Sequence, residues 1–129
     1  MPKLFPCEIV VTQDGQPLSD AVVIAQPVDG SQWNASGSTD ANGKAVLFTQ
    51  GLYKGAIEGK YKVIVQKTAT EKEPSTFEGK PATVEVVYYL VEEKYRDYET
   101  TPLEIEVGSA NPSFVLEAGK AVKSRAPAR

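Results

Sequence analysis

The sequence contains no histidine, and its only cysteine is Cys7. Without an imidazole there is no Ser-His-Asp or Cys-His nucleophile system, no histidine general base and no ordinary zinc site. A single cysteine excludes a disulfide within the chain. It leaves open a disulfide between two copies, or a half-buried residue at the start of a strand. We therefore expect a protein that is not an enzyme, uses no cofactor and binds no small-molecule ligand.

The chain also lacks an apolar run of about 18 residues, and no apolar leader segment follows Met1. We expect no insertion into a membrane and no signal peptide in this sequence. Either the protein acts where it is made, in the cytoplasm or a virion, or a leader was removed and it works outside the cytoplasm or at a cell surface. Its 129 residues, 41% of them hydrophobic, are enough for one domain with a core.

Acidic charge dominates most of the chain. Residues 120–129 hold no acidic residue but four basic ones, Lys120, Lys123, Arg125 and Arg129. The remaining 10 basic and 17 acidic residues give residues 1–119 a net charge of −7. An acidic body argues against nucleic-acid binding. The basic end, rich in Ala and Pro, predicts either a solvated, flexible tail or a segment that docks on a partner.

Apolar and polar residues alternate through most of the chain, with the period of a β-strand. In residues 59–67, Tyr61, Val63 and Val65 are predicted to face one way and Ile64, among polar residues, the other. Strands are predicted around residues 9–12 and over residues 19–28, 31–39, 44–49, 59–67, 82–91, 103–107 and 113–117.

Three segments interrupt this pattern. Residues 68–81 are rich in Glu, Lys, Ser and Pro, which predicts an exposed, mobile loop. Residues 108–112 predict a turn, and residues 86–99 leave open a short helical turn. Seven or eight short strands with frequent turns are typical of an all-β sandwich. We expect one domain over residues 1–118 and a tail over residues 119–129.

Four segments, in this order, resemble one family. They are "VVTQDGQPLSDAVV" from Val10, "ASGSTDANGKAVLFT" from Ala35, "GAIEGKYKVIVQK" from Gly55 and "EEKYRDYETTPLEIEV" from Glu92. Together they resemble the bacterial carboxypeptidase regulatory-like domain of the transthyretin-like superfamily, in its short standalone form. The resemblance covers roughly residues 8–117.

The resemblance implies an antiparallel Greek-key β-sandwich of seven to eight strands, transthyretin-like or immunoglobulin-like. It also implies an exported protein without catalysis, which serves as a spacer, a surface module or an interaction domain. Two positions depart from the family pattern, since Glu8 and Asp20 stand where glycine is frequent. The enzyme of the wider superfamily, 5-hydroxyisourate hydrolase, works with histidines that this chain lacks.

Asp40 and Asn42 are the weak candidates for metal ligands, because Asp-x-Asn begins many calcium loops. Counting from Asp40, however, Lys44 takes a ligand position and Gly51 takes the position of the bidentate glutamate. The alternative is a turn in which the Asp40 carboxylate caps backbone N–H groups and Gly43 takes a positive φ. We favour the turn and expect no metal.

Two covalent modifications fit the sequence. Asn34 begins an Asn-Ala-Ser sequon for N-glycosylation. An internal isopeptide bond, as in some related surface domains, would join Lys3 to Asn111, with Glu85 as the buried acid. The first requires a glycosylating compartment, and the second requires a buried acid between the Lys and the Asn.

The densest aromatic region of the chain follows residue 87. Because Tyr88 and Tyr89 are consecutive, one is predicted to be in the core and the other exposed. Exposed tyrosines beside an arginine make good interface anchors, although core and edge packing explains the same residues. The predicted interaction surface comprises Tyr88, Tyr89, Tyr95, Arg96, Tyr98, Lys120, Lys123 and Arg125.

We therefore predict a non-enzymatic structural or protein-interaction module, at a bacterial cell surface or envelope. The alternative is a subunit of a larger assembly, such as a filament or a phage capsid decoration protein, held by its terminal segments. In both cases the partners are other proteins or copies of the same chain.

Overall fold

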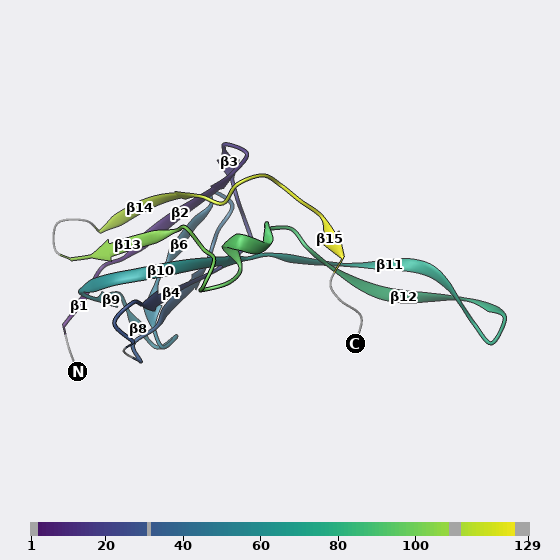
Figure 1. Cartoon of the computed structure of the whole chain (residues 1–129), viewed down its shortest axis with the longest axis horizontal. Coiled ribbons are helices and arrows are strands. Elements are labelled where there is room, and N and C mark those ends of the chain that lie inside the picture. The colour runs from purple at the N-terminus through teal and green to yellow at the C-terminus, as the bar shows by residue number, and fades with distance from the viewer. Residues whose placement is uncertain (1–2, 31, 109–111, 126–129) are drawn as a thin grey trace.

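The computed structural model describes residues 3–30, 32–108 and 112–125, and these residues are almost entirely β-structure (Figure 1). The strands are β1 (Leu4–Phe5), β2 (Glu8–Gln13), β3 (Gln16–Pro17), β4 (Val22–Pro27), β5 (Ala35–Ser38), β6 (Lys44–Val46), β7 (Phe48–Thr49), β8 (Tyr53–Lys54), β9 (Ala56–Ile57), β10 (Gly59–Gln66), β11 (Thr68–Phe77), β12 (Lys80–Tyr89), β13 (Glu104–Val107), β14 (Ser113–Glu117) and β15 (Ser124–Arg125). A 3₁₀ turn, η1 (Glu93–Tyr95), confirms the short helical turn allowed by the sequence. Within the described ranges, no helix is long and apolar enough to cross a membrane.

The larger sheet of the body has the strand order β13-β10-β4-β5-β7-β8, with every neighbouring pair antiparallel. Its centre is the pair β10–β4, in which Val63 lies opposite Ala25 and Val65 opposite Val23. These four side chains are fully buried. The long alternating segment predicted at residues 59–67 therefore supplies the middle of the sheet.

The second sheet has the order β14-β2-β3, and β6 also pairs with β2. Here β14 runs parallel to β2, with Ser113 opposite Glu8 and Val115 opposite Val10. This pair departs from the expectation of an entirely antiparallel fold. The chain changes sheets between β13 and β14, so β14 enters beside β2 from the same end instead of returning in a hairpin.

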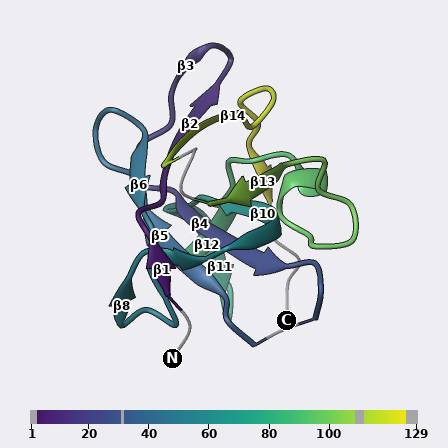
Figure 2. The ribbon, with the colours of Figure 1, turned by 90° about the vertical axis from the view of Figure 1, so that its left-hand side faces the viewer.

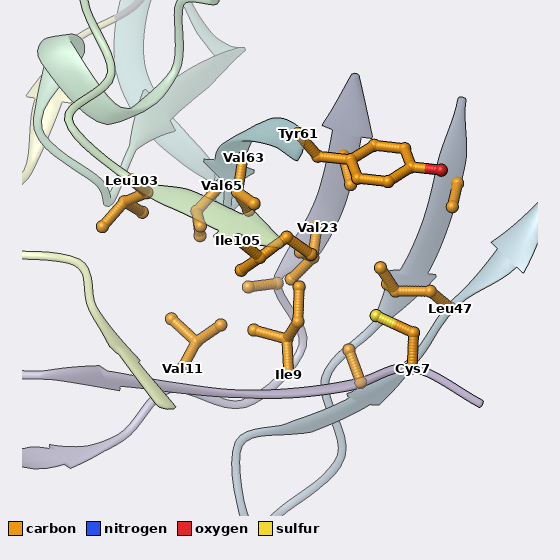
Figure 3. Close-up of a cluster of buried hydrophobic side chains, with 14 of the residues drawn as sticks. Cys7, Ile9, Val11, Val23, Leu47, Tyr61, Val63, Val65, Leu103 and Ile105 are labelled. Atoms are coloured by element: carbon orange, nitrogen blue, oxygen red, sulfur yellow. The ribbon is translucent and has the colours of Figure 1, made fainter. Parts of the chain in front are cut away.

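The two sheets enclose the core, an arrangement consistent with a β-sandwich (Figures 2 and 3). Ile9 and Val11 point from β2 toward Val23 of β4 and Val63 of β10 (Figure 3). The predicted inward face of β10 is confirmed. Ile64, predicted on the outer face, is also buried at 7% exposure, directly opposite Ile24 of β4.

Several predicted strands are shorter than expected or divided. The predicted strand 31–39 begins only at Ala35, which leaves Trp33 outside it, and the predicted strand 19–28 begins at Val22. The predicted strand 44–49 divides at Leu47, because β6 pairs with β2 while β7 pairs with β5 in the other sheet. The predicted turn at 108–112 lies mostly outside the described residues.

The main correction concerns residues 68–81, which were expected to form a loop. They form β11 and the start of β12, a hairpin of two ten-residue strands paired from Thr68↔Tyr89 to Phe77↔Lys80. Ten residues of strand span about 30 Å, and the hairpin projects away from the body (Figure 1). Backbone pairing does not require apolar side chains, so a polar composition conceals it.

Candidate interaction surface at the root of the hairpin

Five of the eight predicted interaction residues come together where the hairpin leaves the body. We call this surface the hairpin root and define it as Tyr88, Tyr89, Arg96, Lys123 and Arg125. The register explains the meeting, because β15 pairs antiparallel with the end of β12, with Arg125 opposite Tyr88 and Ser124 opposite Tyr89. Opposite residues share a face of the ribbon, so the root has two different faces.

One face of the root joins Tyr88 to acids of β11 and bases of the C-terminal segment. The Tyr88 hydroxyl donates a hydrogen bond to the Glu73 carboxylate, and Arg125 Nη1 lies 3.3 Å from Glu73 Oε1. Lys123 Nζ forms an ion pair with Glu71 and lies 4.6 Å from the centroid of the Tyr88 ring. These contacts tie three adjacent strands together across one face.

The electrostatics of this face keep its donors protonated. The hydrogen bond to Glu73 raises the pKa of Tyr88, with smaller contributions from desolvation and from the Glu73 charge. The hydrogen bond to Glu71 raises the pKa of Lys123. At neutral pH the phenol therefore remains a donor and the ammonium remains charged.

The opposite face of the root carries Tyr89 and Arg96. The Arg96 guanidinium carbon lies 3.9 Å from the centroid of the Tyr89 ring, a stacking contact. Arg96 Nε also donates a hydrogen bond of 3.1 Å to the Val91 carbonyl. Two independent contacts thus fix the plane of this guanidinium.

A surface hollow of about 340 Å³ opens beside this arginine. Its lining residues among those described are Tyr89, Glu93, Arg96, Ser124 and Arg125. The hollow is therefore formed by the end of β12 and the η1 turn that follows it, together with β15, which is distant in the sequence. No sequence pattern indicated it, because β15 was not predicted as a strand.

The C-terminal segment is held against the body up to residue 125. Lys120 donates its backbone N–H to Glu92 Oε1 at 2.9 Å, and Ala121 donates its own to Asp14 Oδ2 at 2.8 Å. This part of the segment is mostly exposed to solvent, as predicted, but it is not a free tail, since acids of the body and the hairpin bind it. Residues 126–129 lie outside the described residues.

The other predicted interaction residues lie elsewhere. Tyr95 is buried at 8% exposure and belongs to the core, and the Lys120 backbone contacts Glu92. Tyr98 lies under Lys62 Nζ, 4.9 Å from the ring centroid. The expectation that one of Tyr88 and Tyr89 is in the core is wrong, because both are half-buried where the two-stranded ribbon meets β15.

Asp40 and Asn42 form the predicted turn. Asp40 Oδ1 accepts hydrogen bonds from the backbone N–H groups of Asn42 at 2.9 Å and Lys44 at 3.0 Å. These bonds, led by that from Lys44, lower the pKa of Asp40. Gly43 has a φ of 77°, as the turn requires. Within the described ranges, no three His, Cys, Asp or Glu side chains gather in a way that could hold a metal.

The residues of the predicted covalent modifications are also placed. Asn34 is exposed just before β5. Glu85 is exposed on β12, so it is not the buried acid that an isopeptide bond requires, and Asn111 lies outside the described residues. Cys7 is 1% exposed, deeper than the half-buried position predicted, and this burial removes its thiol from a second copy.

The outer part of the hairpin was missed as a candidate site. Phe77 at its tip is 71% exposed and Val84 on β12 is 42% exposed, while Val87, next to the root, is 39% exposed. One signal could have revealed it. Glu78 and Gly79 have φ values of 51° and 77°, the two positive values of a type I′ hairpin turn, and Gly is favoured there.

No family model matches the chain, and neither a curated protein nor a solved structure does. The resemblance to carboxypeptidase regulatory-like domains therefore stays a prediction, and the arguments about function start from the hairpin and its root.

Proposed function

We propose that this protein is a non-enzymatic interaction module whose projecting hairpin docks on a protein partner, at a bacterial cell surface or envelope. The observation that carries this proposal is the hairpin itself. It consists of two ten-residue strands that leave the body and bury little, and Val86 is the only buried side chain among their described residues.

A ribbon of this kind is poorly stabilised on its own. A two-stranded hairpin is marginal in water, and three or more strands or a packed layer are normally needed. In the described part of the chain, no strand pairs with the outer edge of β11, and β15 covers only Tyr88 and Tyr89 of β12. The edge of β12 from Lys80 to Val87 thus presents unpaired backbone groups, which a partner strand can pair with.

The exposed side chains of the hairpin suit a protein contact. Phe77 at the tip offers an aromatic anchor, and Val84 and Val87 add apolar area along β12. Glu71 and Glu73 are engaged by Lys123 and Arg125, so the root is braced while the tip is free. A braced root and an exposed tip favour docking through the outer half of the hairpin.

The finer fold assignment is part of the same proposal. The four family-like segments fall on β2 to β4, β5 to β7, β9 to β10, and η1 to β13. Their order, and a core enclosed by two sheets, support a transthyretin-like Greek-key sandwich of the carboxypeptidase regulatory-like type. Relatives of that type would also favour an envelope location.

Photo-crosslinking in the native host tests the docking role. A benzophenone amino acid replaces Phe77, 71% exposed, in one strain and Leu52, 73% exposed near β8 on the body, in the other. We expect a defined protein adduct from position 77 and none of that size from position 52. Equal adducts from both positions, or no adduct from position 77, would contradict the proposal.

A second candidate function is that of an assembly subunit, and β15 is the observation that favours it. The C-terminal segment already adds to the edge of β12, through two residues and two ion pairs. The same contacts made on a neighbouring copy would give a head-to-tail chain of subunits. Light scattering over a concentration series tests this, since removal of residues 120–129 should abolish any higher species. A full chain that remains monomeric at high concentration would exclude it.

A further inference from the structure

The hollow at the hairpin root contains a guanidinium without an acidic partner. Three ion pairs occur among the described residues, and Arg96 takes part in none of them. Its Nε is engaged by the Val91 carbonyl and its plane is stacked on Tyr89, while its two terminal nitrogens have no hydrogen bond in the described structure. An arginine fixed in this way loses little conformational entropy when it binds an anion.

The other lining residues determine which anion fits. Arg125 also lines the hollow, but its guanidinium is engaged by Glu73 on the face of Tyr88, and the exposed Ser124 can offer a hydroxyl donor. Glu93 lines the same hollow and adds a negative charge. One planar guanidinium fork beside one negative charge suits a singly charged, planar acceptor better than a doubly charged phosphate.

We propose that this hollow binds a carboxylate side chain of an acidic peptide segment in the partner protein, held by the Arg96 guanidinium. The inference rests on the proposed interaction function and names the chemistry of the partner. Arg96 holds the carboxylate through its two terminal N–H groups, and the face of Tyr89 orients the guanidinium. The site lies beside the end of β12, so an acidic segment bound there can continue along the free edge of that strand.

Nuclear magnetic resonance of the full chain tests this site. The probe is an N-acetylated, C-amidated tetraglutamate peptide, with the tetraglutamine peptide and inorganic phosphate as separate arms. The readout is the side-chain Nε–Hε resonance of Arg96, which a backbone change elsewhere does not move. We expect a saturable shift with tetraglutamate, a much smaller one with phosphate and none with tetraglutamine.

Variants separate this site from general charge attraction. Arg96→Gln should weaken tetraglutamate binding about tenfold, measured by calorimetry, because a charge-assisted bidentate contact is lost. Arg96→Lys keeps the charge but loses the fork, so it should also weaken binding. Lys94→Gln removes the same charge two residues away, outside the lining of the hollow, and should change the affinity by less than about twofold. Dispersed amide spectra establish that each variant is folded.

Three outcomes would overturn the proposal: no shift of Arg96 with tetraglutamate, equal binding of tetraglutamine, or equal losses for Arg96→Gln and Lys94→Gln. Tighter binding of phosphate than of tetraglutamate would also overturn it, in favour of a phosphate site. A defined adduct at position 77, together with no shift of the Arg96 Nε–Hε resonance, would reject the carboxylate site but not the proposed interaction function of the hairpin. Tetraglutamate binding without any adduct at position 77 would reject docking through the hairpin tip instead.

Discussion

β10 in the body and β12 in the hairpin are both long strands, but the burial of their side chains differs sharply. Within its eight residues, β10 buries Tyr61, Val63, Ile64 and Val65, whereas β12 buries only Val86 within ten. Both strands are paired along their length, β10 with β13 and β4, and β12 with β11. Both regions therefore have paired backbones, but only the body buries most of its apolar side chains.

The comparison separates two sources of stability. The body gains most from removal of apolar side chains from water, since each buried aliphatic side chain contributes roughly 1.5–3 kcal/mol. The hairpin depends on its backbone ladder, on cross-strand pairs and on exposed ion pairs, each of which contributes little. We expect the body to unfold as one cooperative unit and the hairpin to open locally at much lower cost.

Matched valine truncations should show the largest contrast. Val63 in β10 is fully buried, so Val63→Ala should lower the free energy of unfolding by roughly 2–3 kcal/mol, through lost burial and the cavity left behind. Val87 in β12 is 39% exposed, and Val87→Ala should change it by less than about 0.5 kcal/mol. Urea denaturation measures both. Similar losses would mean that the hairpin is part of the cooperative unit.

The pH dependence of stability tests whether the Cys7 thiol is buried in the core of the body. Burial first, and the Glu8 charge second, raise the pKa of Cys7 from 9.0 to about 11. Since the folded pKa lies above the unfolded one, the thiol contributes its full stability below pH 9 and loses it as the pH rises toward 11. The loss is at most about 3 kcal/mol. Urea denaturation from pH 7 to 11 should give a flatter profile for Cys7→Ala, and parallel profiles above pH 9 would contradict the burial.

Gly43 in the body and Gly79 in the hairpin have the same φ of 77°, so alanine substitutions at the two positions compare a packed turn with an exposed one. At Gly43 an added Cβ would lie 2.6 Å from the Val11 carbonyl oxygen, whereas at Gly79 nothing lies within 4 Å. Gly79→Ala should cost about 1 kcal/mol in its own hairpin for the positive φ alone, and Gly43→Ala about 2 kcal/mol or more in global stability. Thermal unfolding measures the global effect. Equal melting temperatures for the two variants would show that the Gly43 turn is not packed against β2.

Removal of the C-terminal segment should have the smallest global effect and the most local one. Without residues 120–129, β12 loses its pairing with β15, and Glu71 and Glu73 lose Lys123 and Arg125. Hydrogen exchange should then accelerate around Tyr88 and Tyr89 and stay unchanged in β10. High salt should produce part of the same acceleration in the full chain, because exposed ion pairs are screened. Unchanged exchange in β12 would mean that the segment does not brace the hairpin.

The parts of the fold predicted well are those with a local physical signal. Alternation at Tyr61, Val63 and Val65 predicted an inward face, and these residues form the middle of the larger sheet. The turn at Asp40 and Gly43 followed from side-chain capping and positive φ, and it has that geometry. The candidate surface was located by its tyrosines, but its two faces depended on β15, which has no apolar pattern.

By itself, the sequence determined an all-β chain with a core, because period-two alternation of apolar residues places their side chains on one face of each strand. It also determined that no histidine is present in these 129 residues. Only the tertiary structure decided that a polar segment becomes a hairpin, that β14 runs parallel to β2 and that a basic tail segment binds acidic β11. The physical reason is that backbone hydrogen bonds and ion pairs join residues far apart in the chain, and no local pattern records which partner each will find.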